Sequence, residues 1–228
     1  MKFSYLKKLK PRSGLITRLA ALPMAALLSP ALLFAMAATY ITIGRPIFIT
    51  QPRYGKNKRI FTIYKIRTMT DERDANGQLL PDDARRTKIG SLLRATTIDE
   101  IPQLLNVLKG DMAIIGPRPM EEDVSHVPGW DKRYEVLPGL TGLTQVNTRP
   151  DNFLTDEEKR ALDLLYVRMK KRGGWPLLKL DAQILAHTIY VMFTANHAPM
   201  GGAVRPRNGK GNGKSNGNGH AHRDPDPK

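Results

Sequence analysis

The chain has 228 residues, enough for one ordinary domain with appendages, and a formal net charge of +15. It contains no cysteine, which excludes disulfides and thiolate metal sites. Residues 1–70 hold thirteen basic and no acidic residues, whereas residues 71–200 carry a net charge of −2 and residues 201–228 one of +4. The basic residues of region 1–70 lie on both sides of a hydrophobic segment, and no zinc-finger or RNP-type pattern is present. We therefore expect an anionic membrane lipid as partner and no nucleic acid.

The hydrophobic segment is residues 19–38, twenty residues without a charge, or about 30 Å of helix. A cleaved signal peptide, a spanning anchor and a re-entrant helix all fit this length. Six basic residues precede the segment and seven follow it before residue 68. Both flanks therefore prefer the cytoplasmic side, which favours the re-entrant helix. Ser29 and Pro30 lie at its centre, where a missing amide bends a helix and a serine hydroxyl can satisfy the freed carbonyl.

Two strands are expected next, at residues 47–50 and 59–69, with a turn at residues 51–58 between them. The period of two places Lys65 and Arg67 on one face of the second strand. Such a pair is either a solvated face or a cationic surface that holds a polyanion. Residues 71–83 then read as a polar loop, and residues 91–94 as a short helical stretch that continues into the next helix.

That next helix starts with two adjacent carboxylates, Asp99 and Glu100. One interpretation is structural, because Thr97 to Glu100 fits the Thr-x-x-Glu capping box. The other is catalytic, because Arg94 lies upstream and Arg118 downstream in a Gly-Pro-Arg-Pro turn. Arginine binds phosphate in a bidentate way, and Mg²⁺ is usually held by one or two carboxylates with substrate phosphates. A buried face is expected at Ile101, Leu104, Leu105 and Leu108.

The remaining elements are a Pro-Gly turn with a short strand at residues 137–147 and two helices. The first begins with a second capping box, Thr155 to Glu158, and runs to about Arg172 before two glycines. The second runs from Trp175, an interfacial anchor or a core residue, to about Phe193. The composition from residue 201 onward cannot form a core and predicts disorder.

The fold class that these elements predict is α+β, with a re-entrant membrane helix, a small irregular α/β catalytic domain and amphipathic interfacial helices. We divide the chain into a basic N-terminus with the membrane helix (1–43), a cytoplasmic catalytic domain (44–198) and a disordered basic tail (199–228).

Several motifs in this order resemble one family, the bacterial sugar transferases, which are monotopic phosphoglycosyl transferases. The matching segments lie at residues 44–55, 64–69, 94–105, 110–112, 116–119 and 138–147, and Ser29-Pro30 matches the family's helix break. The resemblance covers roughly residues 15 to 195. With one hydrophobic segment, the chain is similar to the short form of the family.

The resemblance implies a Mg²⁺-dependent enzyme that transfers a phosphosugar from a UDP-sugar to undecaprenyl phosphate, releases UMP and starts exopolysaccharide or lipopolysaccharide assembly. Asp99 would be the nucleophile that carries the phosphosugar, and Glu100 would hold Mg²⁺. The phosphates would be bound by Arg94, Arg118, Arg149, Lys65 and Arg67. The location implied is the cytoplasmic face of the bacterial inner membrane, and a homodimer stays open. The alternative is a basic membrane-bound scaffold in which the acid pair only caps a helix.

Overall fold

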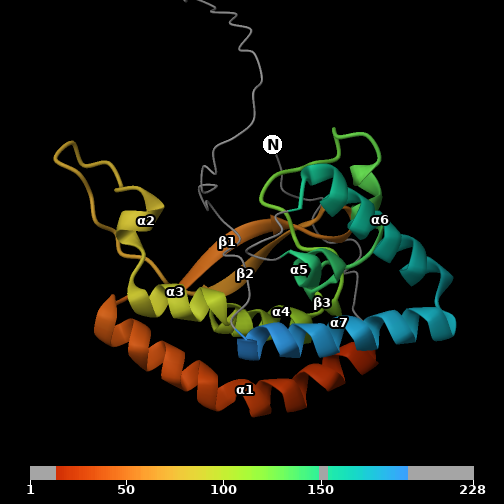
Figure 1. Ribbon diagram of the computed structural model, residues 1–228, viewed down its shortest axis with the longest axis horizontal. Coiled ribbons are helices and arrows are strands. Elements are labelled where there is room, and N and C mark those ends of the chain that lie inside the picture. The colour runs from red at the N-terminus through yellow and green to blue at the C-terminus, as the bar shows by residue number, and fades with distance from the viewer. Residues whose placement is uncertain (1–13, 149–153, 195–228) are drawn as a thin grey trace, which may run out of the picture.

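The computed structural model describes residues 14–148 and 154–194 (Figure 1). Helices dominate and two small two-stranded sheets complete the fold, so the expected mixture of helices and strands is confirmed. In chain order, with η marking 3₁₀ helices, the elements are α1 Leu15–Thr42, β1 Phe48–Tyr54, η1 Lys56–Lys58, β2 Ile60–Ile66, α2 Asp82–Arg85, α3 Lys88–Ala95, η2 Ile98–Gln103, α4 Leu104–Lys109, β3 Ala113–Ile115, η3 Trp130–Glu135, β4 Gly139–Thr141, α5 Leu143–Asn147, α6 Asp156–Arg172 and α7 Gly174–Thr194.

The long helix α1 runs along the bottom of the molecule in Figure 1, beneath α3, α4 and α7. It packs against α3, η2, α4 and β3, and small residues such as Ala21 and Ala35 are fully buried in that contact. Its other face exposes large apolar side chains, among them Leu27 at 79% and Ile41 at 80%. Residues 17–42 are long and apolar enough to cross a membrane by length and composition.

The Ser29-Pro30 pair lies inside α1 and does not end it. The helix continues through Pro30 and is bowed around the rest of the molecule (Figure 1). Proline at position 30 has no amide to donate to the carbonyl of Ala26, four residues back. Ser29 Oγ donates to that carbonyl at 2.8 Å instead, as the sequence predicted. The hydrogen-bond ladder therefore loses one amide donor and gains one hydroxyl donor.

Strands β1 and β2 form an antiparallel ribbon whose register runs from Phe48 opposite Ile66 to Tyr54 opposite Ile60. The turn expected at residues 51–58 is therefore too long, because β1 continues through Pro52 to Tyr54. Proline is tolerated there since β1 has only one neighbouring strand in its sheet, and an edge strand does not need every amide. The second sheet pairs β3 with β4 in parallel.

The single helix expected from residue 91 onward is wrong. Helix α3 ends at Ala95, Thr97 adopts a left-handed conformation with φ of 56°, and η2 precedes α4. A 3₁₀ turn has about 3.0 residues instead of 3.6, so the apolar face shifts. Ile101 and Leu104 are buried as expected, whereas Leu105 is half exposed and Val107 is buried in its place.

The C-terminal helices agree with the sequence. Helix α6 begins with the predicted capping box and ends at Arg172, and Gly173 follows with positive φ. In α7, Leu177 and Ile184 are buried against Tyr166 of α6. Trp175 is 77% exposed, which excludes the core position. The tail from residue 195 lies outside the described residues.

Candidate active site

Asp99 and Glu100 lie in the first turn of η2, which packs against β2 on one side and α1 on the other. Asp99 is 6% exposed, and the side chain of Glu100 is 14% exposed. Two adjacent carboxylates buried to this degree need compensating charges. Those charges come from distant parts of the chain.

Glu100 is held by two cations. Lys65 Nζ, at the end of β2, donates to Oε1 at 2.6 Å, and Arg118 Nη2, after β3, donates to the same oxygen at 2.9 Å. Burial alone would raise the pKa of Glu100, but the charges of Arg118 and Lys65 outweigh it and hold that pKa well below its usual range. Glu100 in turn raises the pKa of Arg118. This carboxylate is therefore ionised at every physiological pH.

Asp99 has the opposite shift. Burial, followed by the negative charge of Glu100, raises the pKa of Asp99 to about 6, against the opposing charges of Lys65, Arg94 and Arg118. Two neighbouring carboxylates with pKa values pushed apart by their surroundings are typical of sites in which each has its own chemical role. Above pH 6 Asp99 is ionised and poorly solvated, the state in which a carboxylate attacks an electrophile best.

The capping interpretation of this segment is wrong. Thr97 makes no side-chain cap to η2, and its Oγ1 donates to the carbonyl of Thr96 at 2.7 Å. Glu100 turns to Lys65 and Arg118 instead of to the backbone of Thr97. A β-branched residue with positive φ is a strained conformation that the surrounding structure must enforce. The turn at Thr97 is what separates η2 from α3 and aims the acid pair at the cations.

Three other predicted residues have different outcomes. Arg94 Nε donates to Thr68 Oγ1 at 2.8 Å, and its charge acts on Asp99. Arg67 follows the last residue of β2, and its described hydrogen bonds go to Met69 O, Arg45 O and Asp71 Oδ2, none of which belongs to the acid pair. The structure thus brings Arg94 to the pair and ties Arg67 to backbone carbonyls and Asp71. Arg149 lies outside the described residues.

The loop that carries Arg118 is fixed by close backbone contacts between the ends of β3 and β4. Gly116 N donates to Thr141 O and Gly139 N to Pro117 O, both at 2.9 Å. A Cβ at Gly139 would lie 2.0 Å from Gly116 N, so only glycine permits this approach. The Gly-Pro-Arg-Pro turn and the Pro-Gly turn of the sequence therefore meet in space and set the position of Arg118.

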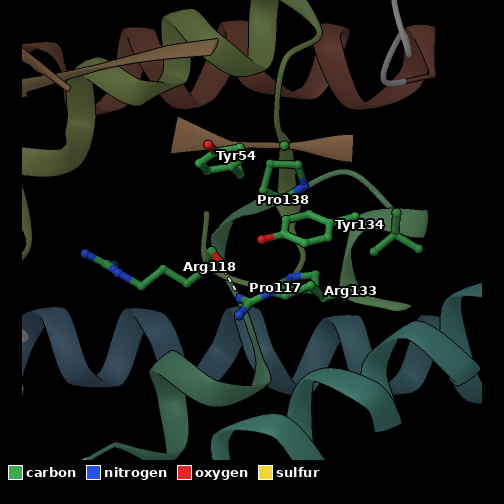
Figure 2. A pocket seen from close by; sticks show the side chains of 8 residues that line it. Tyr54, Pro117, Arg118, Arg133, Tyr134 and Pro138 are labelled. Carbon is green, nitrogen blue, oxygen red and sulfur yellow. Dashed lines mark hydrogen bonds between the residues drawn. The ribbon is translucent and has the colours of Figure 1, made fainter. Parts of the chain in front are cut away.

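Sequence reasoning missed two residues behind this loop. Arg133 Nη2 donates to Arg118 O at 2.6 Å and lies 2.9 Å from Asp163 Oδ2, with both side chains 4% exposed. Figure 2 shows the hydrogen bond from Arg133 to Arg118. Tyr54, Tyr134 and Pro138 lie beside it and line a small pocket with Arg118. Arg133 and Asp163 lie thirty residues apart on η3 and α6, so no local pattern could have paired them.

Arg53 was also missed as a site residue. It is 7% exposed, its Nη2 donates to Gln51 Oε1 at 2.7 Å, and it pairs with Glu121 at 2.6 Å. It lines a second hollow with Glu100, Gln103 and Arg118. Burial and the nearby charge of Arg118 lower the pKa of Arg53, while Glu121 and Glu100 oppose them.

The acid pair can accommodate a divalent cation when a substrate supplies the other ligands. In residues 14–148 and 154–194 no group of three or more His, Cys, Asp and Glu residues gathers as a metal cage. Glu100 Oε2, however, has only a 3.5 Å contact with Arg118 Nη1, which leaves lone pairs for a cation. Mg²⁺ binds in this way, through one or two carboxylates plus phosphate oxygens and water.

Comparison with known proteins matches residues 12–195 to the family model described as bacterial sugar transferase. A Bacillus subtilis protein called uncharacterized sugar transferase EpsL is 46% identical over 162 residues, covering 69% of this chain and 75% of that protein. UDP-glucose:undecaprenyl-phosphate glucose-1-phosphate transferases of Klebsiella pneumoniae and Caulobacter vibrioides are 37% and 36% identical over 177 and 197 residues. The matches cover 73% and 82% of this chain, and 37% and 72% of those two proteins.

Proposed function

The chain belongs to the bacterial sugar transferase family, and from that premise we propose that it transfers a sugar 1-phosphate from a UDP-sugar to undecaprenyl phosphate in exopolysaccharide synthesis. The observation that carries the proposal is the buried acid pair, which lies among the cations Lys65, Arg94 and Arg118. The pKa of Asp99 is raised there, and the pKa of Glu100 is lowered. The relatives from Klebsiella and Caulobacter are named for the same transfer with glucose, which supports it.

In the first step an oxygen of ionised Asp99 attacks the β-phosphorus of the UDP-sugar. The bond between that phosphorus and the oxygen bridging to the α-phosphate breaks, and UMP leaves with the electron pair. The sugar phosphate remains on Asp99 as an acyl phosphate. No base is needed, because the nucleophile already lacks its proton above pH 6. Arg118 and Arg94 stabilise charge on the phosphoryl oxygens.

In the second step an oxygen of undecaprenyl phosphate attacks the same phosphorus, and the Asp99 carboxylate leaves. The product is undecaprenyl diphosphate sugar, and Asp99 returns to its starting state. Splitting the transfer in this way replaces one difficult step with two easier ones. Lys65 and Arg118 keep Glu100 ionised throughout, so the charge of Glu100 does not change between the two steps.

Glu100 is the residue that would hold Mg²⁺, through Oε2 together with phosphate oxygens of the substrate. Bound Mg²⁺ would supply positive charge to the transferring phosphoryl group. The chain's own part is to keep Glu100 deprotonated in a buried setting, and its two cations do so.

We further propose that α1 enters the cytoplasmic face of the inner membrane and returns, giving a monotopic protein. Arg18 Nη2 donates to Lys109 O at 3.1 Å near one end of α1, and Thr39 Oγ1 donates to Arg67 O at 3.3 Å near the other. Those two contacts are about 32 Å apart along a helix. If α1 crossed the bilayer, the polar domain that touches both ends would have to lie inside the bilayer core. The exposed apolar face of α1, with Trp175, Leu178 and Tyr190 of α7, supports contact with lipid.

A panel of nucleotide sugars tests this function. Purified protein in vesicles is mixed with undecaprenyl phosphate, Mg²⁺ and each sugar nucleotide, and both UMP and lipid-linked sugar are measured. We expect equal amounts of the two products from at least one UDP-sugar, and none with a metal chelator. Vesicle-bound, folded protein that releases no UMP with any UDP-sugar would leave the membrane scaffold as the remaining function.

A further inference from the structure

A second group of arginines includes Arg94 of α3 and two residues near the end of α2, Arg85 and Arg86. Arg86 Nε and Nη2 are buried and have no hydrogen-bond partner in the part of the chain that the structure describes. The third nitrogen, Nη1, lies 3.6 Å from Asp83, whose side chain is 67% exposed. Arg85 Nε is also buried without a partner, although Arg85 Nη1 and Nη2 donate to Thr70 O and Asp82 Oδ1. These residues form what we call the upper arginine cluster: Arg85, Arg86 and Arg94.

Unpaired donors of this kind are costly. A buried donor without a partner costs about 1–3 kcal/mol, and more when it is charged. Most buried polar groups in folded proteins are satisfied, so each exception needs an explanation. The side chain of Arg86 is only 14% exposed, and bulk water therefore compensates it poorly. An anion seated against Nε and Nη2 would supply what the protein does not.

One backbone bridge and one side-chain hydrogen bond hold the cluster beside the acid pair. Arg86 pairs with Met69 in an isolated antiparallel bridge, and the neighbouring Thr68 accepts a hydrogen bond from Arg94. Arg86 and Arg94 therefore approach two neighbouring residues, Met69 and Thr68, which follow β2. Burial, and then the charge of Arg86, lower the pKa of Arg94, while Asp99 opposes them. Arg94 thus interacts with Arg86 on one side and with Asp99 on the other.

Helix α3 connects the cluster to α1, because it lies between α2 and α1 in Figure 1. Helix α3, which follows Arg86 and contains Arg94, sits above the C-terminal half of α1 in Figure 1. Leu93 of α3 is buried with Ala35 of α1, and Ile89 packs against the same group. Leu92, on the same helix, is 48% exposed. An anion bound to Arg94 would have the exposed Leu92 within one helical turn of that arginine.

The cations on the other side of the acid pair are already matched by acids. Lys65 and Arg118 share Glu100, and Arg53 pairs with Glu121. In the upper cluster the acids are Asp82 and Asp83, both more than half exposed, and they leave three guanidinium nitrogens unpaired in the described chain. The two sides therefore differ in how much negative charge they can still accept, and the upper cluster can accept more.

We propose that Arg86, together with Arg85 and Arg94, binds the phosphomonoester head group of the polyprenyl acceptor. This inference rests on the proposed function and divides its two substrates in space, with the nucleotide diphosphate on the Lys65 and Arg118 side. A phosphomonoester carries up to two negative charges and three acceptor oxygens, which suit the forked donors of arginine. Arg94, between the clusters, then guides the acceptor oxygen toward the phosphorus on Asp99.

The two half-reactions separate this inference from the function itself. UMP released in a burst without acceptor reports the first step, and the KM for undecaprenyl phosphate reports the second. For Arg86→Gln we expect an unchanged burst and an unchanged KM for the UDP-sugar, with the KM for undecaprenyl phosphate raised about tenfold or more, the size of losing one charged hydrogen bond. Arg86→Lys keeps the charge without the fork and should fall between. Lys88→Gln makes the same charge change two residues away at an exposed position and should change neither KM.

A burst that is absent in the unmodified protein refutes the proposed function, whereas a normal burst with an unchanged acceptor KM in Arg86→Gln refutes only the acceptor site. Equal losses in both half-reactions would also overturn it, since Arg86 would then support the whole site. If Arg86→Gln does not fold, the same comparison is made with Arg86→Lys. Vesicles of phosphatidylglycerol without acceptor form a further arm. If Arg86→Gln weakens binding to them as much as it raises the KM, the cluster binds any anionic lipid and the assignment is wrong.

Discussion

The chain contains the pattern Thr-x-x-Glu at two helix starts, and the two copies fold differently. At α6 the copy forms a reciprocal capping box, with Glu158 N donating to Thr155 Oγ1 at 3.2 Å and Thr155 N donating to Glu158 Oε2 at 2.7 Å. At η2 the same residue types make no cap, and Glu100 accepts from Lys65 and Arg118 instead. The first copy is solvent-exposed and the second is buried.

The difference shows when a local motif decides a structure. At α6 no cation of residues 14–148 and 154–194 forms an ion pair with Glu158, which instead bonds to the start of its own helix. At η2, β2 and the loop after β3 each bring a cation to Glu100, and a buried carboxylate needs such compensating charges, which a backbone amide does not provide. Thr97 has a strained backbone conformation in place of a cap. The same turn places Asp99 beside four charged groups.

The largest effect is expected from Asp99→Asn. The amide cannot attack phosphorus, so UMP release should fall by about 10³-fold or more, as when a nucleophile is removed. The measurement is UMP formation by protein purified in parallel with the native chain. Substantial turnover by the variant would exclude Asp99 as the nucleophile.

Thermal unfolding supplies the control for this variant. Folding raises the pKa of Asp99 from 3.8 to about 6, so the stability that its proton provides is fully present below pH 4 and is lost as the pH rises through 6. Asparagine does not ionise and keeps that stability. Asp99→Asn should therefore melt at least as high as the native protein at pH 7.5, which separates lost chemistry from lost folding.

The next largest effect compares the two glutamates directly. Glu100→Gln leaves Lys65 and Arg118 uncompensated in a mostly buried site and removes the proposed Mg²⁺ ligand, so activity should fall about 10²-fold. Glu158→Gln keeps the capping box, since glutamine also serves at that position, and should retain full activity. Equal effects of the two variants would mean that Glu100 acts only on helix structure. Titration with Mg²⁺ distinguishes a metal ligand, because a weakened site requires more Mg²⁺.

Arg118→Lys should reduce kcat/KM by about tenfold to 10²-fold although it keeps the charge. Arg118 contacts both oxygens of Glu100 with two nitrogens, a fork that lysine lacks. Lys65→Arg changes the other cation that contacts Glu100 and is the matched comparison. Near-native kinetics in Arg118→Lys would show that the Gly-Pro-Arg-Pro turn matters only as a turn.

The pH profile is expected to show Asp99 and not Glu100. Because the pKa of Asp99 is about 6, kcat/KM should rise about tenfold per pH unit below 6 and level off above it. Glu100, whose pKa lies far lower, should leave no inflection in this range. A profile that stays flat from pH 5 to pH 8 would contradict the raised pKa of Asp99.

The smallest effects are opposite changes in stability at the two threonines. Thr155→Ala removes a working cap and should cost about 1 kcal/mol. Thr97→Asn replaces a β-branched residue with one that tolerates positive φ, and should gain about 0.5–1 kcal/mol. Denaturant unfolding of both variants measures this. A loss of stability in both would mean that Thr97 supports its helix after all.

The sequence predicted the parts of the molecule that depend on short-range rules. The ends of α6, the hydrogen bond of Ser29 beside Pro30 and the approach of Arg94 and Arg118 to the acid pair follow from caps, proline chemistry and charge. The break at Thr97 and the exposure of Leu105 could not be predicted from local patterns. Both accompany the 3₁₀ helix η2, in which Glu100 contacts cations from distant parts of the chain. Strand periodicity placed Arg67 on the same face as Lys65, but β2 ends one residue before Arg67.

Arg133, Asp163 and Arg86 were missed for a related reason. The buried pair of Arg133 and Asp163 joins η3 to α6, and only the tertiary structure brings them behind Arg118. Arg86 looks like an ordinary surface arginine in the sequence, and its unpaired nitrogens become visible only once its burial is known. Long-range pairing and unsatisfied burial are properties of packing that no local pattern carries.

The central claim is that Asp99 carries the phosphosugar between two substrates, and mass spectrometry tests it most directly. The protein is incubated with its UDP-sugar and Mg²⁺ without acceptor, quenched, and measured intact and after proteolysis. We predict a mass increase equal to one sugar phosphate less one water, located on the peptide that contains Asp99, absent in Asp99→Asn and lost when undecaprenyl phosphate is added. UMP release that occurs only when acceptor is present, with no adduct on the protein, would show direct transfer and contradict the account.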